Sequence, residues 1–187
     1  RDALSRLREQ GIVYSRQGAG TFVQAAVSPQ AQLAYSPVKT IADIQRCYEF
    51  RLTIEPYAAF FAAQRRDDAA IKKIADALAE LRDATSHQLH RTDADFMFHR
   101  AVTEAANNHY YTASMDALKP HIAVGMHLHG LSLMGPRLQL ERVYGEHEKI
   151  YSAVAEGRAN EAREAMQIHL EGSRDRLFEG KVLDLSI

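Results

Sequence analysis

Asp95 and His99 are a carboxylate and an imidazole that lie one helical turn apart in the stretch DADFMFHRAV. They share a stripe of this predicted helix with Phe98 and Val102, which have the spacing of a buried face. Side chains at i and i+4 point the same way from a helix, and burying both polar groups is costly unless they are paired. The two residues are therefore either a hydrogen-bonded structural pair or part of a metal site.

Two more histidines favour the metal site. Helices are predicted over 136–156 and 159–179, and His147 and His169 lie at equal sequence distances on either side of Arg158, near the turn between them. Because antiparallel helices rise equally per residue, equal distances mean equal height, and the two imidazoles should face each other. Three imidazoles and one carboxylate would hold a divalent ion with open coordination positions. This ligand set suits Zn2+ best, with Ni2+, Mn2+ or Fe2+ as alternatives.

The elements that must position these side chains are predicted to be helices. From about residue 40 the apolar residues recur with helical spacing. The predicted helices cover 40–65, 67–84, 89–106, 109–129, 136–156 and 159–179, with Pro56 in the first and Pro120 in the fourth. Because short connections favour packing of successive helices, residues 39–180 should form an all-α antiparallel bundle of six or more helices, followed by a tail at 181–187.

The N-terminal segment 1–24 has a different pattern. A helix is predicted over 1–10, and two short β-type runs at 12–15 and 21–24 flank a turn with Gly18 and Gly20, which predicts a β-hairpin. The four arginines of this segment outnumber its two acidic residues, whereas the rest of the chain is mildly acidic. Residues 25–38 contain two prolines and little periodicity, so we interpret them as a linker.

The composition of the 187 residues, with 46% hydrophobic residues and a net charge of −1, is typical of a globular protein. No apolar run is long enough to span a bilayer, and a single cysteine suits a reducing compartment, so we expect a cytoplasmic protein with no membrane partner. The motifs H-E-x-x-H, Glu-x-x-His, G-x-G-x-x-G and the P-loop are absent, so no enzyme is predicted. The alternative is a helical metalloenzyme, such as a hydrolase that uses metal-bound water, although the sequence offers no evident general base.

The chain resembles one protein family along nearly its whole length. RDALSRLREQGIVYSRQGAGTFV resembles the end of the winged helix-turn-helix domain of GntR-family transcription regulators, from the recognition helix to the β-hairpin wing. The stretches YEFRLTIEPYAAFFAAQR, DADFMFHRAVTEAANN, GEHEKIYSAVAEGRANEA and MQIHL resemble the FCD-type ligand-binding domain of the FadR subfamily. The winged domain is matched only at 1–24, so we expect the chain to begin inside the recognition helix.

This resemblance implies a bacterial transcription regulator that binds operator DNA as a homodimer and responds to a small organic or sugar acid. In metal-containing members of the family, the ligands correspond to Asp95, His99, His147 and His169. The resemblance also implies that Arg51 grips the carboxylate of the effector. The alternative for Arg51, from the residues alone, is a salt bridge to Glu55 at i+4.

Further candidates follow for the effector and for DNA. Arg174 is a second effector-binding candidate, and Tyr144, one turn before His147, should face the same cavity unless it is an aromatic filler. Arg1 is the residue expected to reach DNA, and Gly18 and Gly20 would let the wing approach the DNA backbone closely. A regulator whose metal is purely structural, with the effector bound elsewhere, is a second alternative.

Overall fold

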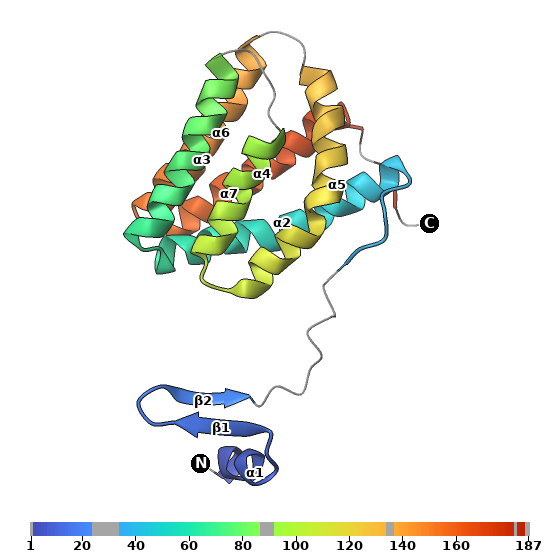
Figure 1. Ribbon diagram of the computed structural model, residues 1–187. Coiled ribbons are helices and arrows are strands. Elements are labelled where there is room, and N and C mark those ends of the chain that lie inside the picture. Colours follow the sequence, from blue (N-terminus) through green and yellow to red (C-terminus); the bar gives the residue numbers. More distant parts are fainter. Residues whose placement is uncertain (1, 24–33, 87–91, 134–136, 182, 186–187) are drawn as a thin grey trace. The chain divides into compact units, whose positions relative to one another are not determined.

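The computed structural model describes residues 2–23, 34–86, 92–133, 137–181 and 183–185 (Figure 1). The chain divides into two compact units, residues 1–32 and 33–187. Arg1 and most of the predicted linker lie outside the described residues, so the structure does not address the predictions made for them. Residues 34–38, the described end of that linker, have no regular secondary structure.

The N-terminal unit contains helix α1 (Asp2–Glu9) and strands β1 (Val13–Arg16) and β2 (Gly20–Val23). The two strands pair antiparallel, with Val13 opposite Val23. Gly18 in the turn and Gly20 at the start of β2 have φ angles of 77° and 101°, which residues with a Cβ rarely adopt, so glycine is favoured at both positions. The predicted helix and hairpin are confirmed, with each strand displaced by one residue.

The second unit is the predicted all-α bundle. Its helices are α2 (Ile41–Arg65), α3 (Asp68–Ser86), α4 (Thr92–Ala105), α5 (His109–Leu133), α6 (Arg137–Ala155) and α7 (Ala159–Leu177). The prediction that α5 ends at residue 129 was wrong, because the helix continues through Gly130; a glycine weakens a helix without necessarily ending it. Within the described ranges, no helix is both long and apolar enough to cross a membrane.

Helix α2 has the most helical neighbours in the bundle, because it packs against α4, α5, α6 and α7. Helix α6 packs along α7 and α3, and Figure 1 shows α3 and α6 side by side. The start of α2 is fixed by a capping box, in which Thr40 accepts a hydrogen bond from the backbone of Asp43 and Asp43 accepts one from the backbone of Thr40. The first helix of the bundle therefore has a well-defined beginning.

The helices that carry the candidate ligands also carry much of the apolar core. Fully buried core side chains on α4, α6 and α7 include Phe98, Val102, Ile150, Met166 and Leu170. Burying one such side chain contributes about 1.5–3 kcal/mol, so these contacts fix the three helices against one another. They also exclude water, which makes any polar group among them costly unless it has a partner.

The turn between α6 and α7 depends on a glycine and on hydrogen bonds from an arginine. Gly157 has a φ angle of 76°. Arg66, which follows α2, donates one hydrogen bond to the carbonyl of Ala63 (2.7 Å) and another to the carbonyl of Ala155 at the end of α6 (3.3 Å). A Cβ atom at Gly157 would lie 2.8 Å from Nη2 of Arg66. This turn therefore helps to set the register of α6 against α7.

Candidate metal centre

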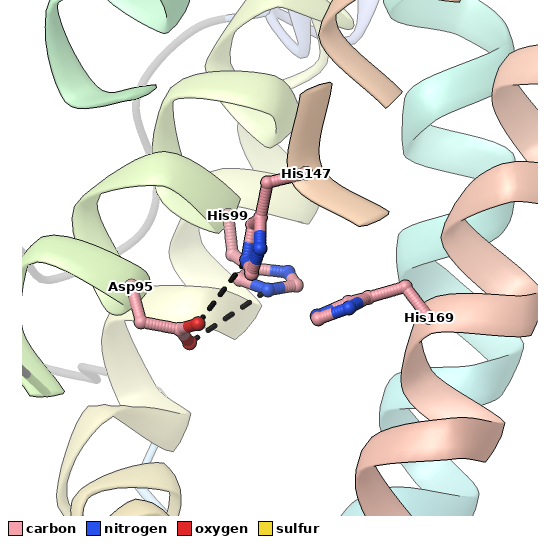
Figure 2. A group of neighbouring side chains, drawn as sticks. All are labelled: Asp95, His99, His147 and His169. Atoms are coloured by element: carbon pink, nitrogen blue, oxygen red, sulfur yellow. Dashed lines mark ion pairs between the residues drawn. The ribbon is translucent and has the colours of Figure 1, made fainter. Parts of the chain in front are cut away.

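Asp95, His99, His147 and His169 converge inside the bundle (Figure 2). Helix α4 supplies the first two, α6 supplies His147 and α7 supplies His169. All four are buried, with exposed fractions from 0% to 5%. One possible ligand atom from each residue lies within 4.8 Å of those of the others. The rings of His147 and His169 have centroids 4.3 Å apart, which agrees with the prediction that they face each other.

The carboxylate of Asp95 faces two imidazole nitrogens. Its Oδ1 lies 3.1 Å from Nε2 of His147, and its Oδ2 lies 3.7 Å from Nε2 of His99 (Figure 2). Although the first distance is short, neither nitrogen makes a hydrogen bond with any group that the structure describes. A buried nitrogen without a partner costs free energy. The two nitrogens are therefore available as ligand atoms for a metal ion.

The other ring nitrogen of each histidine settles which tautomer is present. Nδ1 of His147 lies 2.8 Å from the carbonyl oxygen of Val143, which can only accept, so this nitrogen carries the proton. Nδ1 of His99 donates to Glu55, and Nδ1 of His169 donates to Glu146 over 2.9 Å. Whenever one of these rings is neutral, its lone pair therefore lies on Nε2. Histidines that bind a metal through Nε2 are commonly held in this way.

Glu55 and Glu146 are ionised partners of these histidines. Burial alone would raise the pKa of Glu55, but Arg51 and His99 outweigh it and lower this pKa to about 2. Burial likewise opposes the shift at Glu146, where hydrogen bonds from His169 and Arg176 lower the pKa to about 2. Both glutamates can therefore accept hydrogen bonds at neutral pH and cannot donate them.

The charge states of Asp95 and His169 are those that a metal ligand needs. Burial opposes ionisation of Asp95, but the neighbouring His147 and His99 outweigh it and hold its pKa well below the usual value. Burial, and then the proximity of His147, lower the pKa of His169 to about 3. At neutral pH the cluster thus offers an anionic oxygen and a neutral imidazole. An N/O donor set of this kind, with unpartnered nitrogens, fits a divalent ion.

The predicted effector residues lie in three different settings. Arg51 is buried, and its Nε lies 2.5 Å from Oε1 of Glu55, so the predicted salt bridge at i+4 is present. Tyr144 is partly buried on α6, and its hydroxyl accepts a hydrogen bond from Nε of Arg82 on α3 (3.1 Å). Arg174 pairs with its neighbour Asp175 (2.8 Å). Only Arg51 contacts a group that in turn contacts a candidate ligand, and the effector roles of all three stay predictions.

Sequence reasoning missed Glu146 and saw Glu55 only as a partner of Arg51. Glu146 follows no local spacing rule toward His169, because the two residues lie on different helices. The available signal was that Glu146 directly precedes His147, which places it near the same height in the bundle. For DNA binding, the structure places Gly18 in the hairpin turn and Gly20 at the start of β2, and it does not test their predicted role.

Comparison with known proteins identifies the family. The FCD domain matches residues 46–172, and the chain belongs to the FCD-domain group of GntR-family transcription regulators. The HTH-type transcriptional regulator LutR of Bacillus subtilis strain 168 is 31% identical over 180 residues, which cover 95% of this chain and 82% of LutR. A solved structure described as Streptococcus agalactiae GntR has a TM-score of 0.59 and 25% identity, covering 92% of this chain and 78% of that one.

A further relative comes from Escherichia coli K12. Its name assigns it, provisionally, to regulation of the L-lactate dehydrogenase operon, and it is 29% identical over 184 residues, covering 91% of this chain and 67% of the relative. These relatives are transcription regulators and not enzymes. The chain is accordingly a transcription regulator of the GntR and FCD type, and the metalloenzyme alternative is set aside.

Proposed function

We propose that this chain is a metal-dependent transcription regulator that responds to a small carboxylate. The observation that carries the proposal is the convergence of one buried carboxylate and three imidazoles whose Nδ1 atoms each contact a hydrogen-bond acceptor, which leaves the Nε2 atoms for an ion. A divalent ion, Zn2+ by donor type, would be held by Asp95, His99, His147 and His169. Its open coordination positions would accept an oxygen of the effector.

The charges around the cluster favour a monoanionic effector. The carboxylates of Asp95, Glu55 and Glu146 outnumber the guanidinium groups of Arg51 and Arg176 by one. Arg142 also approaches Glu146, but its side chain is mostly exposed and its charge is screened by water. A divalent ion would change this balance from one negative to one positive charge, which a monocarboxylate would neutralise. A second carboxylate on the effector would restore an uncompensated charge in a buried place.

Arg51 is the proposed grip for that carboxylate. Its guanidinium is 3% exposed, lies near the Tyr48 ring and reaches the cluster through Glu55. An arginine can hold a carboxylate with charge-assisted hydrogen bonds, which would orient the acid toward the metal. Arg174 and Tyr144 are weaker candidates, because the groups that they pair with, Asp175 and Arg82, contact none of the candidate ligands. The name of the E. coli relative makes L-lactate, a small hydroxy acid, the first compound to test.

The remaining parts of the proposal concern DNA. The N-terminal unit would act as the wing and recognition helix of a winged helix-turn-helix domain, with Arg1 reaching DNA and Gly18 and Gly20 allowing close approach to its backbone. The protein would act in the cytoplasm as a homodimer on a palindromic operator. The acid would regulate DNA binding only if it binds the DNA-competent and released states with different affinities.

The test of the proposal is metal analysis of the protein purified without chelator. We expect a stoichiometric divalent metal in the wild-type chain and its loss from a His147→Ala, His169→Ala double variant. L-lactate is then expected to raise the melting temperature of the metal-loaded protein and to have no effect after chelation. If the double variant still contains a stoichiometric metal, the assigned site is wrong. A lactate shift that persists after chelation would favour the alternative of a purely structural metal.

A further inference from the structure

Glu55 lies between an arginine and a histidine, and each of its oxygens serves one of them. Oε1 lies 2.5 Å from Nε of Arg51, and Oε2 accepts the hydrogen bond from Nδ1 of His99. The side chains of all three residues are at most 3% exposed. Water therefore has little access to replace either contact, and both donors depend on the same carboxylate.

Glu146 has a similar arrangement between Arg176 and His169. Its two oxygens accept hydrogen bonds from Nη1 and Nη2 of Arg176, each over 2.9 Å, and Oε2 also accepts the one from Nδ1 of His169. Glu146 is 14% exposed and lines a groove of about 830 Å³ that residues of α3, α6 and α7 form. The second arrangement is therefore built from the same three groups but lies closer to solvent.

We propose that Glu55 and Glu146 are positioning residues that fix the Nδ1–H tautomers of His99 and His169, and that Arg51 and Arg176 hold these glutamates in place. Each arginine acts through a glutamate on a histidine, and none of these four residues would bind the ion itself. The effect on metal affinity rests on the proposed function. The effect on the tautomer does not, because it exists in the metal-free protein.

Replacing Glu55 by glutamine tests this assignment because the two donors would compete for one oxygen. A glutamine offers one carbonyl oxygen, which accepts, and one amide group, which donates. Arg51 is always protonated and can only donate, so it would take the oxygen. The amide would then face Nδ1 of His99, which must become an acceptor. The proton would move to Nε2, and His99 would lose the lone pair that a metal needs.

Removing Arg51 as well is expected to restore the tautomer. In an Arg51→Met, Glu55→Gln double variant, the competing donor is gone, and the glutamine oxygen can turn to accept from Nδ1 of His99. The Nδ1–H tautomer should return although the wild-type charges do not. Glu146→Gln should have a smaller effect at His169, because Glu146 is partly exposed and water can serve as a second acceptor. Glu104, an exposed glutamate that pairs with Lys73, provides the control variant Glu104→Gln.

The experiment combines two measurements at pH 8. The first is the tautomer of each histidine from 15N chemical shifts of the imidazoles in metal-free protein, and the second is Zn2+ affinity from competition with a chelating dye. We expect Nε2–H at His99 and an affinity lower by about 10–100-fold in Glu55→Gln. We expect values near wild type in the double variant and in Glu104→Gln.

The outcomes separate the inference from the proposed function. If His99 keeps the Nδ1–H tautomer in Glu55→Gln, the positioning role of Glu55 is overturned, whatever the zinc result. If the double variant has the same tautomer as Glu55→Gln, the role of Arg51 is overturned. If the wild-type chain binds no Zn2+, the proposed function fails, while the tautomers of the metal-free variants still decide the inference.

Discussion

Oδ1 of Asp95 lies 3.1 Å from Nε2 of His147, and neither atom carries a proton while the imidazole is neutral. Val143 accepts the only proton of that ring, so a lone pair of nitrogen faces an anionic oxygen. Two acceptors this close repel each other unless a cation lies between them. The pair therefore favours a cation between the two atoms, which can be a proton on Nε2 or a metal ion.

Asp95→Asn is expected to change metal affinity and metal-free stability in opposite directions. The asparagine amide can donate to Nε2 of His147, which removes the repulsion and should leave the melting temperature of the chelated protein unchanged or higher. The same change removes the anionic ligand, so the Zn2+ affinity should fall by about 100-fold or more. This loss is at least as large as the loss caused by mutating a residue that only orients a ligand. Thermal melting in chelator and zinc titration measure the two effects. An Asp95→Asn protein that binds Zn2+ as tightly as wild type would contradict the assignment.

The metal-free protein is expected to lose stability as the pH falls from 7 to 5. Burial, with the proximity of His147, lowers the pKa of His169 to about 3 in the folded chain, whereas the ordinary value of 6.5 applies when it is unfolded. Between these values the unfolded chain binds a proton that the folded chain does not. The stability due to the neutral imidazole is therefore complete above pH 6.5 and is lost as the pH falls toward 3. Urea unfolding in chelator at pH 7 and pH 5 measures this loss.

A matched variant isolates the histidine from the glutamates. The pKa values of Glu55 and Glu146 are about 2 when folded and 4.5 when unfolded, so their contributions are lost mainly below pH 4.5. His169→Gln keeps a donor for Glu146 but does not titrate. The difference in unfolding free energy between pH 7 and pH 5 should shrink in this variant, and an unchanged difference would argue against a buried neutral His169.

Gly157→Ala is expected to destabilise the bundle by about 1–3 kcal/mol, because a residue with a Cβ is strained at positive φ. The φ angle there is 76°, and the new Cβ would also lie 2.8 Å from Nη2 of Arg66. Gly145→Ala is the control, because this glycine lies inside α6 with nothing near its Cβ position, and alanine should stabilise the helix by about 0.5–1 kcal/mol. Chemical denaturation of both variants gives the two changes in unfolding free energy. If both changes have the same sign, the prediction for Gly157 is wrong.

Removing the buried ion pair is expected to abolish the response to the acid without unfolding the protein. Replacing a buried pair by uncharged groups is often neutral for stability, so Arg51→Met with Glu55→Gln should fold and bind Zn2+. It should show no increase in melting temperature with L-lactate, whereas Arg174→Gln should keep most of the increase. If the double variant responds as wild type does, Arg51 is not the residue that grips the carboxylate.

Regular helix geometry explains why the sequence predicts the cluster of four candidate ligands. Asp95 and His99 share a face because they are four residues apart, and His147 and His169 meet because they are equally far from one turn. The contacts of Glu55 with His99 and of Glu146 with His169 join separate helices, and no spacing along the chain encodes them. The direction of Tyr144 was ambiguous for a related reason.

Tyr144 lies three residues before His147, which on a helix is a similar but not identical direction. Its hydroxyl reaches Arg82 on α3, a contact that depends on the helix packed against that side. The length of α5 was also underestimated, because Gly130 is compatible with a helix whose continuation depends on the bundle. Local rules thus predicted the elements and the cluster, while neighbours in space decided the partners.

Helix α2 would connect binding of the acid at Arg51 to the start of the bundle. It carries Arg51 and Glu55, and it begins at Ile41, just after the segment that leads from the N-terminal unit. Ten residues of a helix span about 15 Å, so a displacement of Arg51 would be transmitted along one rigid rod to the point where the chain exits. Communication between acid and operator would then need no relay through other helices, and its efficiency would depend on the stiffness of that first stretch of α2.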